Sequence, residues 1–503
     1  APYRAVYLVN LVPGRYGGFS IEDVQQRLYP DDVRDLSPLL VGRVSYATES
    51  VLESARADQL EYLEVTSLPP AAIDVEAAER ISTLRTRLRH DHDRANKELG
   101  IAGLEALLEP VLRGRRGWRI EERDGDKNVQ RLIEMVDALD GRHVRTTLDV
   151  DLQAACDRVL SQMVERGALV LLDPRDGAIR ALATSPNPTR LQVRKEWEDL
   201  RNDERQPLHH RAFRPPGNPP PPGSVFKIVT AAAALEGGHA TAGTTFRCDG
   251  TLRVGRTTLK CYQRQAHGDI DLVTALEKSC NIWFYKISRE VGLEALLEMA
   301  SRLGYGEAVG FGDPDVLGLP PGARSIGELP CPFQAGRGVT FTMRTAIGHG
   351  AVDDVTPLQV AAMMASVAHG AMRVRPYLVE SIGGVPAPRP EPTALGLRPS
   401  TLSTLRRGMI AAVETGTARP VGGDDLRVFG VAAKTGTPQA VAKGGRMVDH
   451  AWMAGYLPHD APRLAFALLI EENDVGGGGA TRPVMAELFR QPEFEALFGA
   501  GIR

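Results

Sequence analysis

Three apolar runs near the C-terminus are the feature that most constrains the fold. They are "VFGVAAKTGT" at 428–437, "DHAWMAGYL" at 449–457 and "RLAFALLIEE" at 463–472. Polar or proline-marked turns separate them, which is typical of consecutive antiparallel strands. Helical patterns fill much of 224–300, 341–372 and 400–415. An antiparallel sheet with segregated helices is an α+β architecture, and that is the fold class the sequence predicts.

A further hairpin is predicted ahead of these elements. "ALVLLDPRDGAIRALAT" at 168–184 places apolar runs on both sides of a Pro/Asp/Gly turn. Residues 190–223 are expected to form a long loop that is first polar and then proline-rich.

The length of 503 residues exceeds one ordinary hydrophobic core, so more than one domain is expected. Residues 1–143 are charged, with a predicted helix at 75–98 and a glycine-rich "LRGRRG" at 112–117 that ends the next helix. We interpret 1–143 as an N-terminal non-catalytic support or interaction domain and 144–503 as the domain that carries the chemistry.

Composition excludes several classes of function. A net charge of −3 provides no basic surface for nucleic acid. No G-x-G-x-x-G follows a predicted strand, and no Walker loop is present. The sequence shows no initiator Met, no signal peptide and no apolar run near 18 residues. The protein is therefore expected to be wholly soluble or to have an N-terminal anchor outside this chain.

A serine is held stiffly at the start of a helix in "PPPPGSVFKIVTAAAALE", residues 219–236. Ser224 and Lys227 are three residues apart, so in a helix they share a face. A serine hydroxyl needs a base to become a nucleophile, and the helix N-terminus offers N–H groups to a developing oxyanion. S-x-x-K also occurs by chance in many helices, so its meaning depends on partner motifs.

Two partner motifs lie downstream. "KSCNIWFYKIS" supplies Ser279 and Asn281, whose spacing suits either a turn that points both side chains into one cleft or a helix N-cap. "VAAKTGTPQ" places a second motif on a predicted strand: Lys434, Thr435, Gly436 and Thr437. Its glycine leaves room for a substrate against the strand, and its threonine hydroxyls suit a carboxylate.

S-x-x-K, S-x-N and K-T-G in this order are typical of penicillin-binding proteins and class A β-lactamases. With "LDVDLQ", "LDPRDGAIRALATSP", "AIGHGAVDDVTPLQVAAMMA" and "HAWMAGYLP" around these motifs, the chain resembles the class B penicillin-binding proteins, which are monofunctional peptidoglycan transpeptidases. "FRCDG…LKCYQRQAHGDIDLVTALEKSCN" is most similar to the cell-elongation subgroup. The resemblance implies a penicillin-binding (serine transpeptidase) fold preceded by an elongated N-terminal pedestal. It also implies covalent inhibition by β-lactams.

The resemblance also implies a role for each catalytic residue. Ser224 would attack the carbonyl of the penultimate D-Ala of a stem peptide, with Lys227 as general base. Ser279 would relay a proton to the leaving D-Ala amine, and Asn281 would contact the substrate peptide. The ammonium of Lys434 and partial desolvation are expected to lower the pKa of Lys227.

The strand motif would form the substrate-binding set: Thr435, Gly436 and Thr437. The two threonine hydroxyls would bind the terminal carboxylate. The backbone N–H groups of Ser224 and Thr437 would form the oxyanion hole. No cofactor is needed for this acyl transfer.

The same resemblance implies a location and partners. It places the protein at the periplasmic face of the bacterial inner membrane. Its ligands would be peptidoglycan stem peptides and β-lactams. Its protein partners would be a SEDS-type membrane glycosyltransferase and other elongation-complex proteins, without nucleic acid.

Three other functions share this chemistry. A D,D-carboxypeptidase differs only in accepting water, and a β-lactam-binding scaffold or sensor would bind without turnover. A β-lactamase is more compact: here Ser224 and Ser279 are 55 residues apart, and Ser279 and Lys434 are 155 apart.

Three cysteines and a histidine form a separate pattern, C-x₁₂-C-x₅-H-x₁₂-C: Cys248, Cys261, His267 and Cys280. Three thiolates and an imidazole suit a closed, structural Zn²⁺ site. A Cys248–Cys261 disulfide is the alternative, since the family works where thiols oxidise. In a third interpretation, Cys280 is simply buried and His267 is a loop residue.

Overall fold

The computed structural model describes residues 37–46, 76, 79–80, 83, 98–113, 118–123, 129–137, 139–213, 220–306, 333–391, 393–419, 425–441, 447–473 and 475–498. These residues belong to one compact unit, Leu36–Arg503. The predicted domain boundary between residues 143 and 144 lies inside this unit and stays a prediction.

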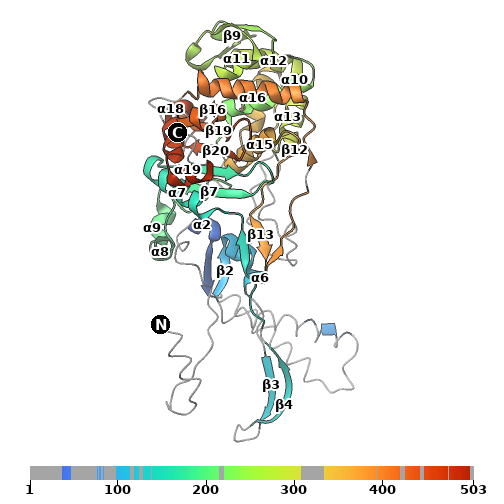
Figure 1. Ribbon diagram of the computed structural model, residues 1–503, viewed down its shortest axis with the longest axis vertical. Coiled ribbons are helices and arrows are strands. Elements are labelled where there is room, and N and C mark those ends of the chain that lie inside the picture. The colour runs from blue at the N-terminus through green and yellow to red at the C-terminus, as the bar shows by residue number, and fades with distance from the viewer. Residues whose placement is uncertain are drawn as a thin grey trace. The chain divides into compact units, whose positions relative to one another are not determined.

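A five-stranded antiparallel sheet lies at the centre, in the order β16-β19-β20-β6-β7 (Figure 1). Its strands are β16 (Ala432–Gly436), β19 (Ala451–Leu457), β20 (Leu464–Ile470), β6 (Gly167–Leu172) and β7 (Ile179–Ser185). The three C-terminal runs are antiparallel neighbours in the sheet, as predicted, but the strands of the first two runs are not consecutive, because the β17–β18 hairpin lies between them in the sequence. The predicted hairpin of β6 and β7 completes the sheet by pairing β6 with β20.

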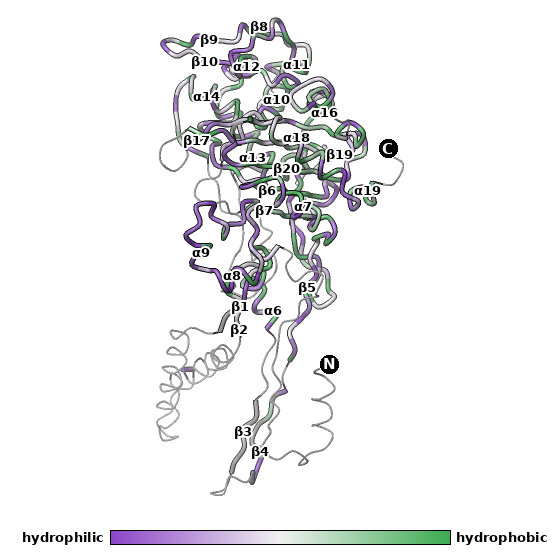
Figure 2. Tube along the Cα trace, turned by 90° about the vertical axis from the view of Figure 1, so that its left-hand side faces the viewer, coloured by the Kyte–Doolittle hydropathy of each residue, from purple (hydrophilic) through white to green (hydrophobic). Residues whose placement is uncertain are grey.

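Both faces of the sheet are covered. Successive residues of β6 belong to different core clusters: Ala168, Val170 and Leu172 to one, Leu169 and Leu171 to the other. Helix α15 (Pro357–His369) packs on the first face, and α7 (Val150–Met163) and α18 (Gly477–Phe489) pack on the second. Every residue of β6, β19 and β20 is buried, which explains why these strands are continuously apolar. Figure 2 shows the same strands in hydrophobic colours.

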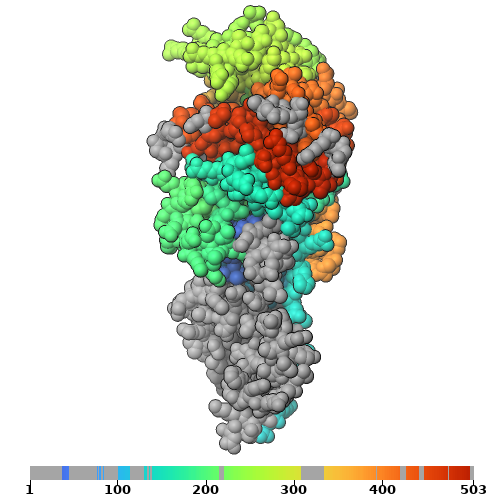
Figure 3. All heavy atoms as spheres, turned by 60° about the vertical axis from the view of Figure 1, so that its left-hand side comes forward, coloured from blue at the N-terminus to red at the C-terminus, as the bar shows by residue number. Residues whose placement is uncertain are grey.

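The remaining helices surround the first face and the sheet edge. They are α10 (Lys227–Glu236), α11 (Leu272–Glu277), α12 (Asn281–Val291), α13 (Leu293–Arg302), α14 (Val339–Thr345) and α16 (Pro399–Glu414). Short elements complete them: η3 (Gly223–Phe226), η6 (Gly350–Val352), α17 (Asp425–Val428) and α19 (Pro492–Phe498). Helices α18 and α19 contact α7, and Figure 3 shows the red C-terminal segment beside the turquoise segment that contains α7. The helical patterns predicted over 341–372 and 400–415 are confirmed.

Two predictions of local structure are partly wrong. Within 224–300, residues 246–270 form short strands and one 3₁₀ turn: β8 (Phe246–Cys248), β9 (Thr251–Val254), β10 (Thr257–Lys260), η4 (Tyr262–Arg264) and β11 (Gly268–Ile270). Within 190–223, two short hydrophilic helices replace part of the expected loop: α8 (Arg190–Lys195) and α9 (Trp197–Asn202) (Figure 2). A capping box at Thr189 and Gln192 starts α8, because these side chains satisfy free N–H groups of the first turn.

Small sheets occupy the rest of the described chain. The N-terminal part contains α2 (Pro38–Val41), β1 (Arg43–Tyr46), β2 (Glu98–Ala102), α5 (Gly103–Leu107), α6 (Glu109–Leu112), β3 (Trp118–Arg123) and β4 (Val129–Val136). Later come β5 (Val144–Thr146), β12 (Met372–Arg373), β13 (Val379–Ile382), β14 (Val385–Pro386), β15 (Thr393–Ala394), β17 (Gln439–Val441) and β18 (Met447–Asp449). Helix α6 ends at the predicted "LRGRRG" segment, whereas most of the helix predicted at 75–98 lies outside the described residues.

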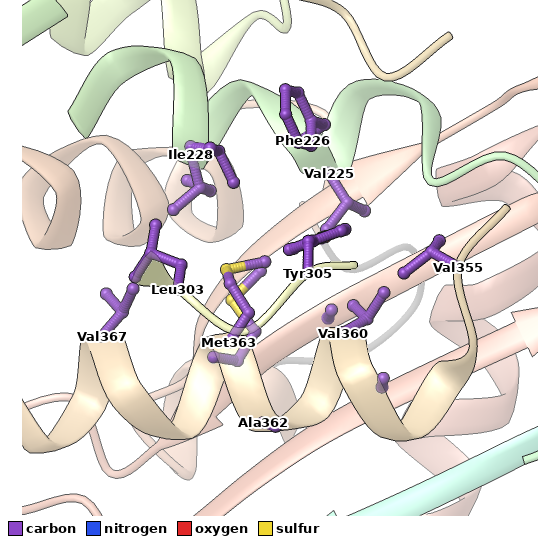
Figure 4. Close-up of a cluster of buried hydrophobic side chains, with 14 of the residues drawn as sticks. Val225, Phe226, Ile228, Leu303, Tyr305, Val355, Val360, Ala362, Met363 and Val367 are labelled. Carbon is purple, nitrogen blue, oxygen red and sulfur yellow. The ribbon is translucent and has the colours of Figure 1, made fainter. Parts of the chain in front are cut away.

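The core beneath helix α10 gives this helix a rigid support. Figure 4 shows Val225 and Ile228 on one side of a buried apolar cluster and Val360 and Met363 of α15 on the other. All four side chains have no more than traces of solvent exposure. Because such interiors are close-packed, the start of α10 cannot shift without disturbing α15.

Within the described residues, no helix is both long enough and apolar enough to cross a membrane.

Candidate active site

A cleft of 1140 Å³ brings the three sequence motifs together. Its walls include six of the predicted catalytic and substrate-binding residues: Ser224, Ser279, Asn281, Thr435, Gly436 and Thr437. Lys227 and Lys434 are fully buried beneath it. The eight residues come from three segments, 224–227, 279–281 and 434–437, which are far apart along the chain, so only the tertiary fold assembles them.

Ser224 lies in the 3₁₀ turn η3, and Lys227 is the first residue of helix α10. In a 3₁₀ helix, side chains three residues apart lie directly above one another. The 3₁₀ turn therefore aligns Ser224 with Lys227 better than the α-helical spacing that was predicted. The approach is fixed by Gly223, whose N–H donates to Gly348 O at 3.1 Å. A Cβ on Gly348 would lie 2.0 Å from Gly223 O, and the φ of 84° there also requires glycine.

The Lys227 ammonium links the first motif to the second. Its Nζ donates to Asn281 Oδ1 at 2.6 Å, to Ser279 O at 2.7 Å and to Ser279 Oγ at 3.1 Å. Burial lowers the pKa of Lys227 to about 8, and the charges of Cys261 and Cys280 oppose this shift. The pKa of Lys227 is therefore lowered, as predicted, and burial is the cause. The ammonium of Lys434, the other cause that was expected, does not contribute, because the pKa of Lys434 is itself strongly lowered.

Lys434 reaches the same serine from the strand β16. Its Nζ donates to Ser279 Oγ at 2.8 Å and to Thr435 O at 3.0 Å. Burial and then the charge of Lys227 hold the pKa of Lys434 well below its usual range. Ser279 Oγ therefore bridges two buried lysine amines, an arrangement suited to passing a proton between them and the cleft.

Ser279 occupies the turn between α11 and α12. Its φ of 53° is uncommon for a residue with a side chain, and such strain is found at functional sites. Cys280, and not Ser279, is the N-cap residue of α12, so the N-cap interpretation of Ser279 is wrong. Asn281 is held on both sides, because its Nδ2 donates to Lys260 O at 3.1 Å and its backbone N–H to Cys261 Sγ at 3.3 Å.

The K-T-G run lies on the edge strand β16 of the central sheet. A Cβ on Gly436 would lie 2.9 Å from Pro222 O, so glycine permits the strand to approach the Ser224 turn. Thr437 Oγ1 accepts the Gly477 N–H at 2.8 Å, which leaves its own hydroxyl proton free for a ligand.

Several supporting residues were missed in the sequence analysis. Thr435 Oγ1 donates to Thr417 Oγ1 at 2.7 Å, and Trp452 Nε1 donates to Pro221 O at 2.9 Å. Gly477 starts α18 beside Thr437. The glycine run at 476–479 was a visible signal for a close backbone approach. No sequence signal pointed to Thr417 or Trp452, because the residues that they contact lie in other segments of the chain.

The predicted cysteine and histidine residues gather next to the S-x-N turn. One ligand atom from each of four residues lies within 4.8 Å of the others: Cys248, Cys261, His267 and Cys280. The distances from His267 Nδ1 to Cys248 Sγ and to Cys261 Sγ are 3.4 and 3.7 Å, and the two sulfurs of Cys261 and Cys280 are 4.0 Å apart. A tetrahedral zinc ion with ordinary bond lengths would need edges of about 3.6 Å for S···N and about 3.8 Å for S···S.

The three thiols of this cluster are free, with no disulfide between Cys248 and Cys261 in the described structure. All three are buried, and the Cys280 thiol, as the main cause, lowers the pKa of Cys261 to about 5. A thiolate is the form that binds a metal. The donor set, its spacing and its burial therefore fit a metal ion, and the cluster could hold one.

Comparison with known proteins identifies the domain. Residues 167–490 match the family model of the penicillin binding protein transpeptidase domain. The peptidoglycan D,D-transpeptidase MrdA of Acinetobacter baumannii is 28% identical over 408 residues, which cover 76% of this chain and 59% of that protein. The chain thus spans about three fifths of the length of this curated relative.

Solved structures share the fold. The penicillin-binding protein PBP2 of Helicobacter pylori, in complex with MreC, superposes with a TM-score of 0.71 at 22% identity, covering 93% of this chain and 78% of that one. Penicillin-binding protein A of M. tuberculosis, as its penicillin G acyl-enzyme complex, has a TM-score of 0.60 at 26% identity, covering 72% and 82%. The predicted α+β fold is thereby confirmed.

Proposed function

Because this chain belongs to the penicillin-binding protein transpeptidase family, among its elongation-type class B members, we propose that it is a peptidoglycan D,D-transpeptidase. It would cross-link stem peptides through a serine acyl-enzyme and be acylated by β-lactams. The observation that carries the proposal is the bridge from Lys227 through Ser279 to Lys434 beneath a cleft that Ser224 lines.

These contacts support the following acylation step. Lys227 Nζ, when neutral, takes the proton of Ser224 Oγ as this oxygen attacks the carbonyl of the penultimate D-Ala. The C–N bond to the terminal D-Ala then breaks. Ser279 Oγ passes its proton to the leaving amine and receives one from the ammonium of Lys227, to which it is hydrogen-bonded at 3.1 Å. Lys227 is thus restored as a neutral amine.

The developing oxyanion needs two N–H donors, which we assign to Ser224 and Thr437. Ser224 lies in the first turn of η3, where backbone N–H groups have no partner within the helix. Such a preorganised donor typically contributes about 10²–10³ to the rate. Asn281 would hold the peptide of the substrate. The hydroxyl of Thr437 would donate to its terminal carboxylate, and that of Thr435 would do so after turning away from Thr417.

The second half-reaction transfers the acyl group to an amine of a neighbouring stem. The amine attacks the ester carbonyl, loses a proton to Lys227 and releases Ser224 Oγ, which regains its proton. Water in place of the amine would give a carboxypeptidase, so the two outcomes differ only in the acceptor.

We further propose that the Cys/His cluster holds one structural Zn²⁺. Four protein ligands would leave no position for water, so the ion would have no part in the acyl transfer. Its role would be to fix the S-x-N turn, since Cys280 separates Ser279 from Asn281 and Cys261 Sγ accepts the Asn281 N–H.

We also propose a periplasmic location at the inner membrane and partners in an elongation complex, including a SEDS-type glycosyltransferase. A PBP2 to which this chain is similar forms a complex with MreC, which supports protein partners. The described part of residues 1–143 would act as the pedestal through which such partners are contacted.

Fluorescent penicillin tests the proposed function. The wild type should form a stable adduct that peptide mapping places on Ser224, and Ser224→Ala should not be labelled. Release of the penicilloyl group should be slow. Labelling that persists in Ser224→Ala would contradict the assignment, and release many times per second would indicate a β-lactamase.

A further inference from the structure

The walls of the active-site cleft carry far more positive charge than the chain as a whole. The chain has a net charge of −3. The wall nevertheless includes four cationic side chains, Lys260, Lys278, Arg344 and Arg482, against two acidic groups, the carboxylate of Asp449 and the thiol of Cys261. This count does not include the buried Lys227 and Lys434. The excess of positive charge therefore remains even when both of these amines are neutral.

The four cations are available to a ligand. In the part of the chain that the structure describes, none of them forms an ion pair. Arg482 donates to the carbonyl oxygens of Gly478, at 2.6 Å, and of Arg419. These partners are neutral, so the charge of Arg482 stays uncompensated. Lys260, Lys278 and Arg344 are exposed. A cleft with one sign of charge attracts substrates of the opposite sign.

Arg344 is the cation most closely connected to the Ser224 turn. It lies in the last turn of α14, and its carbonyl accepts the N–H of His349 at 3.0 Å. The adjacent Gly348 accepts the Gly223 N–H, directly before Ser224. A cation in the last turn also stabilises its own helix through the helix dipole. This stabilising role alone would not explain why the Arg344 side chain lines the cleft.

Tyr285 lines the same cleft as Arg344. It is four residues after Asn281 on α12, so both side chains are on the same face of that helix. It lines the cleft although it is only 5% exposed, and its hydroxyl has no hydrogen bond within the described residues. Helix α12, which carries Tyr285, packs against α14, which carries Arg344, and both side chains line the same cleft.

We propose, on the basis of the transpeptidase function proposed above, that Arg344 and Tyr285 form a subsite for a second carboxylate of the stem peptide. The terminal carboxylate would bind at Thr435 and Thr437, which line the same cleft but come from the K-T-G strand. A guanidinium binds a carboxylate with two parallel hydrogen bonds, and the unpartnered phenol O–H supplies a third. The enzyme would therefore prefer stems whose internal carboxylate is free over stems in which it is amidated.

Two synthetic stem-peptide thioesters test this preference. They are identical except that the second residue is D-glutamate in one and D-glutamine in the other, and Ser224 displaces the same thiol from both. The measurement is the rate at which intact-protein mass spectrometry detects the acyl-enzyme. The wild type should react about tenfold faster with the free acid, because hydrogen bonds to charged groups are worth at least that factor.

Arg344→Gln should slow acylation by the acid peptide to the rate of the amide peptide and leave the amide rate unchanged. Arg337→Gln is the matched control, since Arg337 is exposed on the same segment but does not line the cleft. Tyr285→Phe, which keeps the ring, should lose part of the preference.

Fluorescent penicillin labelling distinguishes a failure of the proposed subsite from a failure of the proposed transpeptidase function. Labelling that is normal in Arg344→Gln shows an intact Ser224 site, so a loss of preference in that variant supports the subsite. Equal rates for the two peptides in the wild type, or a preference that survives Arg344→Gln, would overturn the inference while leaving the transpeptidase function in place. Absence of labelling in the wild type would instead refute the function itself.

Discussion

The rate of β-lactam acylation should rise steeply with pH, because the proposed base must be neutral. Burial lowers the pKa of Lys227 to about 8. The neutral fraction should then grow from about 1% at pH 6 to about one half at pH 8, a gain of about fiftyfold. Activity is thus lost as pH falls through 8, since protonation removes the base.

Asn281→Asp tests the cause of this profile. Asn281 Oδ1 accepts a hydrogen bond from Lys227 Nζ at 2.6 Å, so the variant would place a carboxylate against the ammonium. An opposite charge at this distance stabilises the protonated form and should raise the pKa of Lys227 by about 1–3 units. The midpoint of the profile should therefore move to higher pH, and acylation at pH 7 should fall by at least about tenfold.

Stopped-flow measurement of fluorescent penicillin labelling between pH 6 and pH 10 provides the second-order rate constants. Circular dichroism at each pH confirms that the protein stays folded. His349→Asn is the control for a histidine on the cleft wall, and its profile should match that of the wild type. A wild-type rate that does not change with pH, or an Asn281→Asp midpoint that is unchanged or lower, would refute Lys227 as the base.

Three further predictions concern stability and the metal. Cys261→Ser should reduce the zinc content from about one ion per chain, measured by elemental analysis of unchelated protein; metal-free wild type would contradict the site. Burial raises the pKa of Asp157 from 3.8 to about 7, so wild-type stability should fall by up to ~4 kcal/mol as pH rises through this range. Asp157→Asn should remove that fall. If the difference in melting temperature between pH 5 and pH 8 were the same in Asp157→Asn as in the wild type, Asp157 would not be its cause. Glu471→Gln should cost about 3–5 kcal/mol in thermal or denaturant unfolding, because the buried Arg211 guanidinium, 3.1 Å away, loses its counter-charge. Asp203→Asn, which breaks an exposed ion pair, should cost less than about 1 kcal/mol, and equal costs for the two variants would show that burial is not decisive.

The central strands could be predicted because their sequence contains the reason for their structure. β19 and β20 are apolar throughout and bounded by turn residues, since helices cover both of their faces. The strands within 246–270 escaped prediction for the opposite reason. β8 and β11 have three residues each and carry no periodic pattern, so they are held by their pairing and by the adjacent Cys/His cluster.

The sequence by itself determined which chemical groups the active site would contain. Ser224 and Lys227 are three residues apart and share a face of their helical turn. Ser279 and Asn281 are two apart, and the turn before α12 brings them together. The same holds for the K-T-G run on its strand.

Tertiary structure alone decided how these groups act on one another. Lys434 meets Ser279 across 155 residues of sequence, and Thr435 finds Thr417 on a separate segment. The pKa of Lys227 depends on burial by distant elements, and the stem-peptide subsite depends on α12 and α14 lying side by side. Burial and electrostatic interaction depend on distance in space and not on separation along the chain, so no local pattern could reveal them.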